Sequence, residues 1–323
     1  MRQSETMNLV CAVDLGGTNL RAAIIDRQGS IHEGVRVSTP DTDNPYEIVS
    51  AIASAMTECG SHGAKRGQKI QAVSVVVPGS VHLDSGVIVN APNVPSIVEF
   101  DLAGALSAEL HRPVSLENDA NAAAVGEMWR GAGRGYQTLI CLTLGTGVGS
   151  GIILNGKLWR GIDGTGGEIG HASVVPLGGV KCKCDGVGCL EVYASATAIV
   201  RMTLEGLPDH SQSILNARRE ADLSAKDVAA AAKEGDAFAL EIFRKMGMYL
   251  GVAMANLVNI FNPEIIIVGG GVSESFALFA PTAREEMMKR SFPVPARRCR
   301  FARAECGDNA GLLGAAWLAF GVR

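Results

Sequence analysis

The sequence lacks an excess of charge of either sign. Its 323 residues include 29 Lys and Arg against 33 Asp and Glu, which gives a formal net charge of −4 at pH 7. A protein whose main partner is nucleic acid or an anionic membrane usually presents a strong basic field. The charge balance therefore disfavours both classes of partner and leaves a small molecule as the expected one.

Long hydrophobic runs are also missing. Apolar segments are interrupted by Gly, Asn or a charged residue before they reach the ~18 residues that a membrane helix needs, and the N-terminus does not resemble a signal peptide. We therefore expect a cytoplasmic protein. The hydrophobic content of 47% is enough for a globular fold, organised as two domains or one large α/β unit.

A regular disulfide framework is absent, because the eight cysteines are irregularly spaced. In a cytoplasmic protein this pattern favours metal ligands and reduced thiols over disulfides. Five cysteines are isolated in the sequence and are expected to be reduced thiols, most of them in the core: Cys11, Cys59, Cys141, Cys299 and Cys306.

The other three cysteines gather in one glycine-rich stretch, residues 167–191. Together with one histidine they form a Cys₃His set, which tetrahedral Zn²⁺ favours: His171, Cys182, Cys184 and Cys189. Unrelated thiols or a disulfide are the alternatives. Glu168 and Glu191 flank the set, and a purely structural zinc site needs neither acid. Carboxylates held in place by a metal loop would suit a polyhydroxylated ligand.

Strand and helix signals alternate along the chain, which predicts an α/β fold. Apolar or β-branched runs predict strands at 9–14, 21–26, 34–38, 70–77, 113–117, 138–144, 264–268 and 300–303, with a brief strand entering a loop at 87–95. Amphipathic runs predict helices at 44–59, 101–111, 120–129, 191–205, 224–234, 236–261, 277–289 and 309–319. The first helix should bury Ile48, Ile52, Ala55 and Met56.

An internal repeat is visible in two segments, VCAVDLGGTNLRAAIID at 10–26 and ICLTLGTGVGSGIIL at 140–154. Each predicts a strand, a glycine turn and a returning strand, and the copies are about 130 residues apart. The repeat suggests two related domains that face one cleft and offer backbone amides to the same phosphate chain. Two ordinary glycine hairpins are the alternative. A domain boundary is expected near Asn118 or in the glycine cluster at 131–135.

Asp14 and the turn that follows it combine a carboxylate, bare backbone amides and a hydroxyl. The turn residues are Gly16, Gly17, Thr18 and Asn19. This combination suits a Mg²⁺-bound polyphosphate, although Asp-x-Gly-Gly also occurs in plain turns.

Two further glycine segments come after predicted strands. The segment 145–151 matches neither a Walker loop nor a convincing dinucleotide fingerprint. The segment Gly269–Gly271 either brings backbone against a flat adenine or ribose, or only permits a tight turn.

Asn118 and Asp119 stand where the strand at 113–117 meets the helix at 120–129. Asp119 is the candidate general base, which would accept the proton of an attacking hydroxyl while Mg²⁺ and loop amides hold the transferred phosphoryl group. Alternatively, Asp119 caps the helix, a role that stabilises it by ~1 kcal/mol. Since Asn118 can cap equally well, the polar pair favours the base.

These motifs together resemble the ROK family of bacterial sugar kinases, within the actin, hexokinase and Hsp70-like ATPase superfamily. The resemblance rests on DLGGTNLRAAIID at 14–26, ENDANAAAVGE at 117–127, LTLGTGVGSGIILNGKLWRG at 142–161, GEIGHASVVP at 167–176 and the cysteine cluster through Glu191. The segment CLEVYASATAIVR at 189–201 looks most like the ROK glucokinases.

The resemblance implies a duplicated actin/hexokinase-like (ribonuclease H-like) ATPase fold with two domains around a cleft. The smaller domain would comprise 1–117 and a C-terminal helix at about 309–323. The larger would comprise 118–308 and contain the zinc loop. A homodimer or homotetramer is also implied.

The implied activity is an ATP-dependent hexose kinase that acts on the glucose 6-hydroxyl, with Mg²⁺, a structural Zn²⁺ and Asp119 as the base. Mg-ATP would be bound by Asp14, Gly16, Gly17, Thr18, Asn19, Gly145, Thr146 and Gly147, with Gly269, Gly270 and Gly271 flanking the adenosine. The sugar would be bound by Gly79, Asn93, Asn118, Asp119, Glu168, His171 and Glu191. His171 would place one ring nitrogen on zinc and the other towards the sugar.

One position departs from the family pattern, because Asp185 stands where the pattern has a glycine. Asp tolerates left-handed backbone, so the metal loop is expected to form.

Other acceptors remain open, namely N-acetylmannosamine, N-acetylglucosamine, fructose or allose, as does polyphosphate as the donor. A sugar-responsive transcriptional regulator of the same family is a different class. It needs a helix-turn-helix ahead of the kinase-like body, and the thirteen residues before Asp14 are too few for one.

Overall fold

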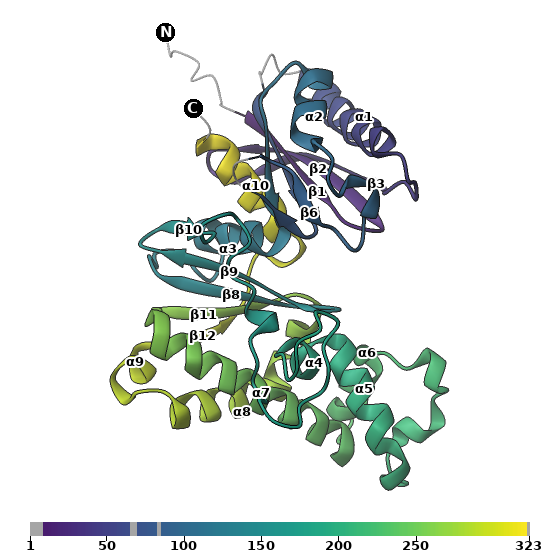
Figure 1. Cartoon of the computed structure of the whole chain (residues 1–323), viewed down its shortest axis with the longest axis vertical. Helices are drawn as coiled ribbons and strands as arrows, with labels where there is room; N and C mark the ends of the chain where they lie inside the picture. The colour runs from purple at the N-terminus through teal and green to yellow at the C-terminus, as the bar shows by residue number, and fades with distance from the viewer. Residues whose placement is uncertain (1–8, 65–69, 83–84, 322–323) are drawn as a thin grey trace.

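Two five-stranded sheets form the framework of the protein. In Figure 1 the first sheet lies in the upper part of the molecule, which we call the first body, and the second sheet lies in the lower part, the second body. The computed structural model describes residues 9–64, 70–82 and 85–321. The first sheet has the order β3-β2-β1-β4-β7 and the second β10-β9-β8-β11-β12. The first contains β1 Leu9–Leu15, β2 Asn19–Asp26, β3 Ile31–Ser38, β4 Ile70–Val77 and β7 Val114–Asn118. The second contains β8 Leu139–Leu144, β9 Val148–Leu154, β10 Lys157–Trp159, β11 Ile265–Gly269 and β12 Arg300–Arg303.

The two sheets repeat one topology. In the first, β1 pairs with β2 and β2 with β3 in antiparallel fashion, whereas β1–β4 and β4–β7 are parallel. In the second, β8–β9 and β9–β10 are antiparallel, whereas β8–β11 and β11–β12 are parallel. The predicted internal repeat is confirmed. Two unrelated glycine hairpins do not account for it, because the duplication extends to whole sheets.

Two helices connect the bodies by crossing each other. Helix α3, Asp119–Arg130, follows β7 of the first sheet but packs on β8 and β9 of the second. Helix α10, Ala310–Gly321, follows the second sheet but packs on β1 and β4 of the first. A Cβ at Gly314 would lie 1.8 Å from the carbonyl oxygen of Ala122, so glycine allows the close crossing. Figure 1 shows both helices where the bodies meet.

The remaining helices pack on the sheets and on one another. In the first body, α1 packs on β2 and β3 and α2 on β7; α1 buries Ile48, Ile52, Ala55 and Met56 as predicted. In the second body, α7 and α8 pack side by side (Figure 1). The bounds are α1 Pro45–Ala64, α2 Leu102–Leu110, α4 Glu191–Ala194, α5 Ala196–Gly206, α6 Ala225–Lys233, α7 Ala237–Phe261, α8 Phe276–Arg290 and α9 Pro293–Arg298.

One helix prediction needs correction. The helix predicted at 191–205 is split into α4 and α5, because Ser195 adopts an extended backbone and its hydroxyl accepts the Ala198 N–H to cap α5. The brief strand that was predicted to enter a loop within 87–95 is confirmed as β6, Ile88–Asn90, which pairs with β5, Ser80–Val81. The loop ends in a 3₁₀ turn, Pro95–Ile97.

Residues 1–8, 65–69, 83–84 and 322–323 of the predicted smaller domain lie outside the described residues. Within the described part of the chain, no helix is both long enough and apolar enough to cross a membrane.

Candidate active site

Residues from both bodies line a cavity of about 480 Å³. Asp14 enters it from β1, Asp119 from the start of α3 and Thr143 from β8. The Gly269–Gly271 segment at the end of β11 forms another part of the wall, and Gly311 of α10 closes the side nearest Asp14. The crossing of α3 and α10 therefore brings residues that are far apart in sequence to one cavity.

Asp14 is partly buried and faces Arg21 on the neighbouring strand, with Arg21 Nη1 at 4.0 Å from Asp14 Oδ2. Burial raises the pKa of the Asp14 carboxyl; Arg21 opposes this shift and Asp308 adds to it. Arg21 also donates to the Asp308 carbonyl oxygen and to Asn309 Oδ1. Arg21 thus connects the first sheet to the 3₁₀ turn Gly307–Asn309 that precedes α10.

The Gly269–Gly271 segment combines a tight turn with a place in the wall of the larger cavity. All three glycines line the cavity. Gly270 has a φ of 79°, and a Cβ there would lie 2.4 Å from the carbonyl oxygen of Leu144. The segment is therefore a tight turn as well as a wall of the cavity.

The other two predicted phosphate turns lie elsewhere. The turn Gly16–Asn19 closes β1 onto β2, with the Gly16 N–H donating to Asn19 O at 2.9 Å. The turn Gly145–Gly147 joins β8 to β9 and is held by α5, since Ala196 N–H donates to Gly145 O and Thr197 Oγ1 to Thr146 O. Neither turn is among the described residues that line the cavity, whereas Thr143 is.

A second, smaller pocket of about 50 Å³ shares Asp119 and Ala120 with the larger cavity. Its other polar lining comes from both bodies and comprises Ser80, Asn118, Asn121, Ser150 and Glu168. Asp119 therefore lies where a large cavity meets a small polar pocket. A carboxylate in that position can accept a proton from a group in one pocket that reacts with a group in the other.

The structure shows which of the two residues caps α3. Asn118 is the N-cap of α3, because its Oδ1 accepts the Asn121 N–H at 3.0 Å. Asp119 is the first helical residue, and its Oδ1 accepts hydrogen bonds from the Ala120 N–H at 2.8 Å and from Asn118 Nδ2 at 3.1 Å. The helix therefore does not need the Asp119 carboxylate as its cap.

The environment of Asp119 raises the pKa of its carboxyl to about 6. The surrounding protein, which removes water from the charged form, is the main cause, and the Asp14 carboxylate adds repulsion. Hydrogen bonds from Ala120 and Asn118 oppose the shift. A carboxylate with this pKa is ionised at neutral pH and is more basic than an ordinary Asp.

The predicted metal ligands come together in one cluster. The ligand atoms of His171, Cys182, Cys184 and Cys189 all lie within 4.8 Å of one another. Cys184 Sγ is 3.7 Å from Cys189 Sγ, and Cys182 Sγ is 3.7 Å from His171 Nδ1. Two sulfurs at about 2.3 Å from a tetrahedral zinc ion are about 3.8 Å apart, so the cluster fits the ion.

The chemistry of the thiols also fits a bound cation. All eight cysteines are free thiols. Burial, together with the neighbouring sulfurs, raises the pKa of Cys189 to about 12, a cost to the thiolate form that a divalent cation would relieve. Asp185 has the left-handed backbone predicted for it, with a φ of 66°.

The structure brings three of the seven predicted sugar ligands into the smaller pocket, namely Asn118, Asp119 and Glu168. The other four are outside the described lining of that pocket. Gly79 lies next to it, since its carbonyl oxygen accepts a hydrogen bond from Asn118 Nδ2 at 2.9 Å. Asn93 packs on the Gly16–Asn19 turn, where a Cβ at Gly17 would be 2.8 Å from Asn93 Cβ.

Glu191 and His171 lie at the Cys₃His cluster. Glu191 Oε2 accepts the Val148 N–H at 3.0 Å, and Oε1 is 4.0 Å from Cys182 Sγ. The His171 side chain is exposed, and its Nδ1 faces the sulfurs.

Several pocket residues were not predicted from the sequence. In the larger cavity they include Thr143, Lys226, Glu274, Arg303 and Asp308, and in the smaller pocket Ser80, Ser150, Gly164, Gly166 and Gly167. Ser80 and Gly164–Gly167 directly adjoin predicted residues, so proximity to Gly79 and Glu168 was a usable signal. Thr143 and Ser150 lie inside the repeat segment 140–154, whereas Lys226, Glu274, Arg303 and Asp308 are single side chains on separate elements and have no local signal.

Comparisons with known proteins agree with this architecture. The family model described as the ROK family matches residues 10–321. The glucokinase of Halalkalibacterium halodurans is 40% identical over 308 residues, which cover 95% of this chain and 93% of the relative. A crystal structure of a ROK family glucokinase from Streptomyces griseus in complex with glucose and AMPPNP superposes with a TM-score of 0.79 at 35% identity, covering 97% of this chain and 100% of that one.

The matches also include a regulator. The xylose repressor of Caldicellulosiruptor bescii is 33% identical over 249 residues, which cover 76% of this chain and 61% of the repressor. The similarity to the S. griseus structure confirms the predicted fold class, a duplicated actin-like ATPase fold built from two α/β halves.

Proposed function

The chain belongs to the ROK family, and from this premise we propose that it is an ATP-dependent hexose kinase, specifically a glucokinase that phosphorylates the 6-hydroxyl of glucose. The observation that carries the proposal is the place of Asp119, whose carboxylate joins a cavity of about 480 Å³ to a small polar pocket. The nucleotide would occupy the larger cavity and the sugar the smaller pocket.

The reaction needs one proton acceptor and a set of groups that hold the phosphates. Asp119 would remove the proton of the 6-hydroxyl while the sugar oxygen attacks the γ-phosphorus and ADP leaves. Mg²⁺ would neutralise charge on the transferred phosphoryl group, and Asp14 would hold it. Gly269–Gly271 would lie against the adenosine, and the Gly16–Asn19 and Gly145–Gly147 turns would bind phosphate when the two bodies close.

The sugar would be recognised by the remaining predicted residues. Asn118 and Glu168 line the smaller pocket and would bind sugar hydroxyls directly. Gly79, Asn93, His171 and Glu191 surround the pocket in our proposal and would contribute after closure. Glucose would be held with its 6-hydroxyl towards Asp119.

We propose that the Cys₃His cluster binds a structural Zn²⁺. Four protein ligands complete a tetrahedral shell, which leaves no open position for water or substrate. His171 Nδ1 faces the cluster, so its other ring nitrogen would be available to the sugar. The ion would brace the loop that carries Glu168, His171 and Glu191.

The division into domains, the assembly and the location of the protein remain proposals. Residues 1–117 with the C-terminal helix at about 309–323 would move against 118–308. Packing of α10 on β1 and β4 supports this division. A homodimer or homotetramer in the cytoplasm is what the family resemblance and the composition lead us to expect.

Kinase activity should be measured in a coupled assay across a panel of sugars, with ATP and polyphosphate compared as donors. The expected result is phosphorylation of glucose by ATP. If glucose is among the poorest acceptors beside N-acetylmannosamine, N-acetylglucosamine, fructose and allose, the substrate assignment is wrong. A regulator related to the xylose repressor would bind sugar without transferring phosphate to any of them.

The pKa of Asp119 predicts how activity depends on pH. The base works only when ionised, so kcat/KM should be constant above pH 7 and should fall about tenfold for each pH unit below the Asp119 pKa of about 6. The profile is measured in parallel with circular dichroism, which excludes acid unfolding as the cause. A profile that stays flat from neutral pH to about pH 5 would contradict the role of Asp119.

A further inference from the structure

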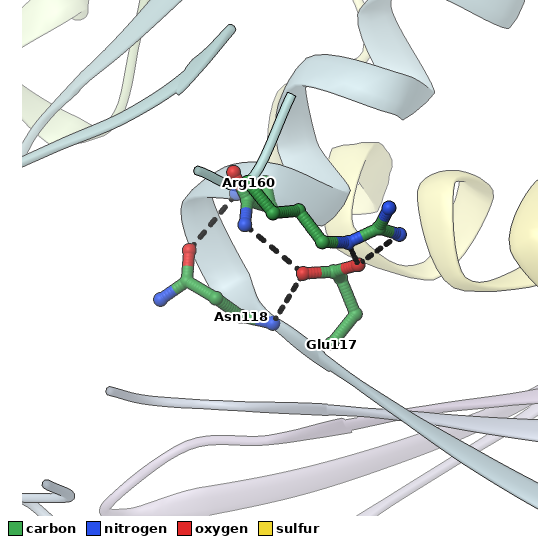
Figure 2. Close-up of polar contacts among 4 residues, drawn as sticks. Glu117, Asn118 and Arg160 are labelled. Carbon is green, nitrogen blue, oxygen red and sulfur yellow. Dashed lines mark hydrogen bonds and ion pairs between the residues drawn. The ribbon is translucent and has the colours of Figure 1, made fainter. Parts of the chain in front are cut away.

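The carboxylate of Glu117, near the end of β7, is 5% exposed and accepts four hydrogen bonds (Figure 2). Oε2 accepts two from Arg160, from Nε at 2.8 Å and from Nη2 at 2.6 Å. Oε1 accepts the backbone N–H of Asn118 at 3.1 Å and Nδ2 of Asn121 at 3.0 Å. One buried acid therefore binds a guanidinium on one side and the start of α3 on the other.

The α3 side of this network holds the residues next to the general base. Asn118 is fixed twice, because its backbone N–H is bound by Glu117 and its Oδ1 accepts the Asn121 N–H. Its Nδ2 donates to Asp119 Oδ1 at 3.1 Å. The orientation of the Asp119 carboxylate thus depends on Asn118, which in turn depends on Glu117.

The Arg160 side of the network holds the opposite wall of the smaller pocket. Arg160 directly follows β10 and begins the loop that leads to Glu168. Its carbonyl oxygen accepts the Gly166 N–H at 2.9 Å, and a Cβ at Gly166 would lie 2.9 Å from Gly161 Cα, so the loop returns tightly upon its own start. Gly164, Gly166, Gly167 and Glu168 of this loop line the pocket.

Neither Glu117 nor Arg160 is among the described residues that line the two active-site pockets. Both instead line a separate cavity of about 320 Å³, beside Trp317 of α10. The pair therefore does not contact a substrate in either pocket, although each partner is bonded to a wall of the sugar pocket.

We propose that Glu117 and Arg160 are positioning residues that set the separation between Asp119 and the Glu168 loop. This inference rests on the proposed function, because it assigns the smaller pocket to the sugar. A buried acid with two donors from one guanidinium has a defined geometry, unlike a pair formed through a single contact. Losing the guanidinium leaves the Glu117 charge buried without its partner, so the start of α3 and the loop are expected to shift apart.

The test is the variant Arg160→Ala, assayed for the KM of each substrate and for kcat. A displacement of about 1 Å at a site of this kind costs up to about 100-fold. We expect the KM for glucose to rise by about tenfold to 100-fold with a lower kcat, while the KM for ATP changes less than about twofold. A matched control is Arg219→Ala, which removes an exposed Arg–Asp pair with Asp222 and should change neither constant.

Chemical rescue distinguishes positioning from a general loss of stability. Because Arg160 borders the 320 Å³ cavity, added guanidinium at millimolar concentration can reach Glu117 in Arg160→Ala. It should lower the glucose KM of this variant most of the way to the wild-type value. Sodium at equal ionic strength should not lower the glucose KM of the variant, and guanidinium should not change the glucose KM of the wild type. Glu117→Gln keeps the side-chain shape without its charge; it should also raise the glucose KM, and guanidinium should not rescue it.

The outcomes separate this inference from the proposed function. If the wild type phosphorylates no sugar, the proposed function fails. If the wild type is active and Arg160→Ala keeps its glucose KM within about twofold, the positioning role is wrong. It is also wrong if the KM for both substrates and the melting temperature change together without rescue. Should Arg160→Ala not fold, Arg160→Lys, which keeps the charge but loses the two-donor geometry, must still raise the glucose KM, and an unchanged value overturns the inference.

Discussion

Asp119→Asn is expected to lower kcat by about 100-fold to 10,000-fold, the range that a positioned general base supplies. The amide cannot accept the proton of the sugar hydroxyl. It retains an oxygen in place of Oδ1, which can still accept the hydrogen bonds that now come from the Ala120 N–H and Asn118 Nδ2. The start of α3 should therefore keep its shape, and glucose affinity measured by calorimetry should change little.

The stability of the Asp119→Asn variant provides a second readout, whose sign follows from the raised pKa. Folding raises the pKa of Asp119 from 3.8 to about 6, so the folded protein binds this proton more tightly than the unfolded chain does. The group's favourable contribution is complete below pH 3.8 and is lost as the pH rises through 6. At pH 8 the ionised carboxyl therefore disfavours folding, and the neutral Asn variant should melt at the same temperature as the wild type or higher.

The control for Asp119→Asn is Asp209→Asn, a change at an exposed aspartate outside both pockets, which should leave kcat and the melting temperature unchanged. Substantial phosphorylation by Asp119→Asn would contradict the assignment of the base. So would a loss of activity that is fully explained by unfolding.

Cys184→Ala is expected to lower stability more than any other of these substitutions. The wild type should contain one zinc ion per chain, and the variant little or none, as measured by elemental mass spectrometry. Structural zinc sites contribute about 10 kcal/mol or more of apparent binding free energy in small domains. Even a modest part of that energy would lower the melting temperature by many degrees.

The kinetic effect of Cys184→Ala should fall mainly on sugar binding. The metal loop carries Glu168 and His171, so glucose KM should rise, while transfer at saturating glucose should suffer less, because Asp119 lies on α3 and not on this loop. Removal of zinc from the wild type with a chelator should reproduce these changes. A variant with normal zinc content, melting temperature and glucose KM would rule out the structural metal.

Cys299→Ala is the matched control for Cys184→Ala. Cys299 is a buried thiol outside the Cys₃His cluster, so its loss should leave zinc content and glucose KM unaltered. The cost of removing a small buried side chain should be about 1 kcal/mol.

Features that depend on neighbouring residues could be predicted from the sequence. The Cys₃His cluster is one example, since Cys182, Cys184 and Cys189 are close along the chain and only a short loop has to bring them together. The duplicated strand–turn–strand pattern was sufficient to predict two related halves.

Local sequence patterns did not predict which residue caps a helix at two positions. Ser195 interrupts a continuous amphipathic run because its hydroxyl finds the Ala198 N–H, which the periodicity does not reveal. Asn118 and Asp119 have equal claims to the N-cap in the sequence, and the structure selects Asn118. The backbone conformation at the end of β7 therefore decides which of the two side chains caps the helix and which one is left without that role.

The sequence by itself determined the family, the Cys₃His set and the presence of two related halves. Only the tertiary structure decided how these parts meet. Asp14 and Asp119 reach one cavity because α3 and α10 cross at small residues. Glu117 pairs with Arg160, which is 43 residues away in the sequence and belongs to the other half. The physical reason is range: caps and ligand loops depend on the backbone of adjacent residues, whereas the separation between pocket walls depends on the packing of elements from the whole chain.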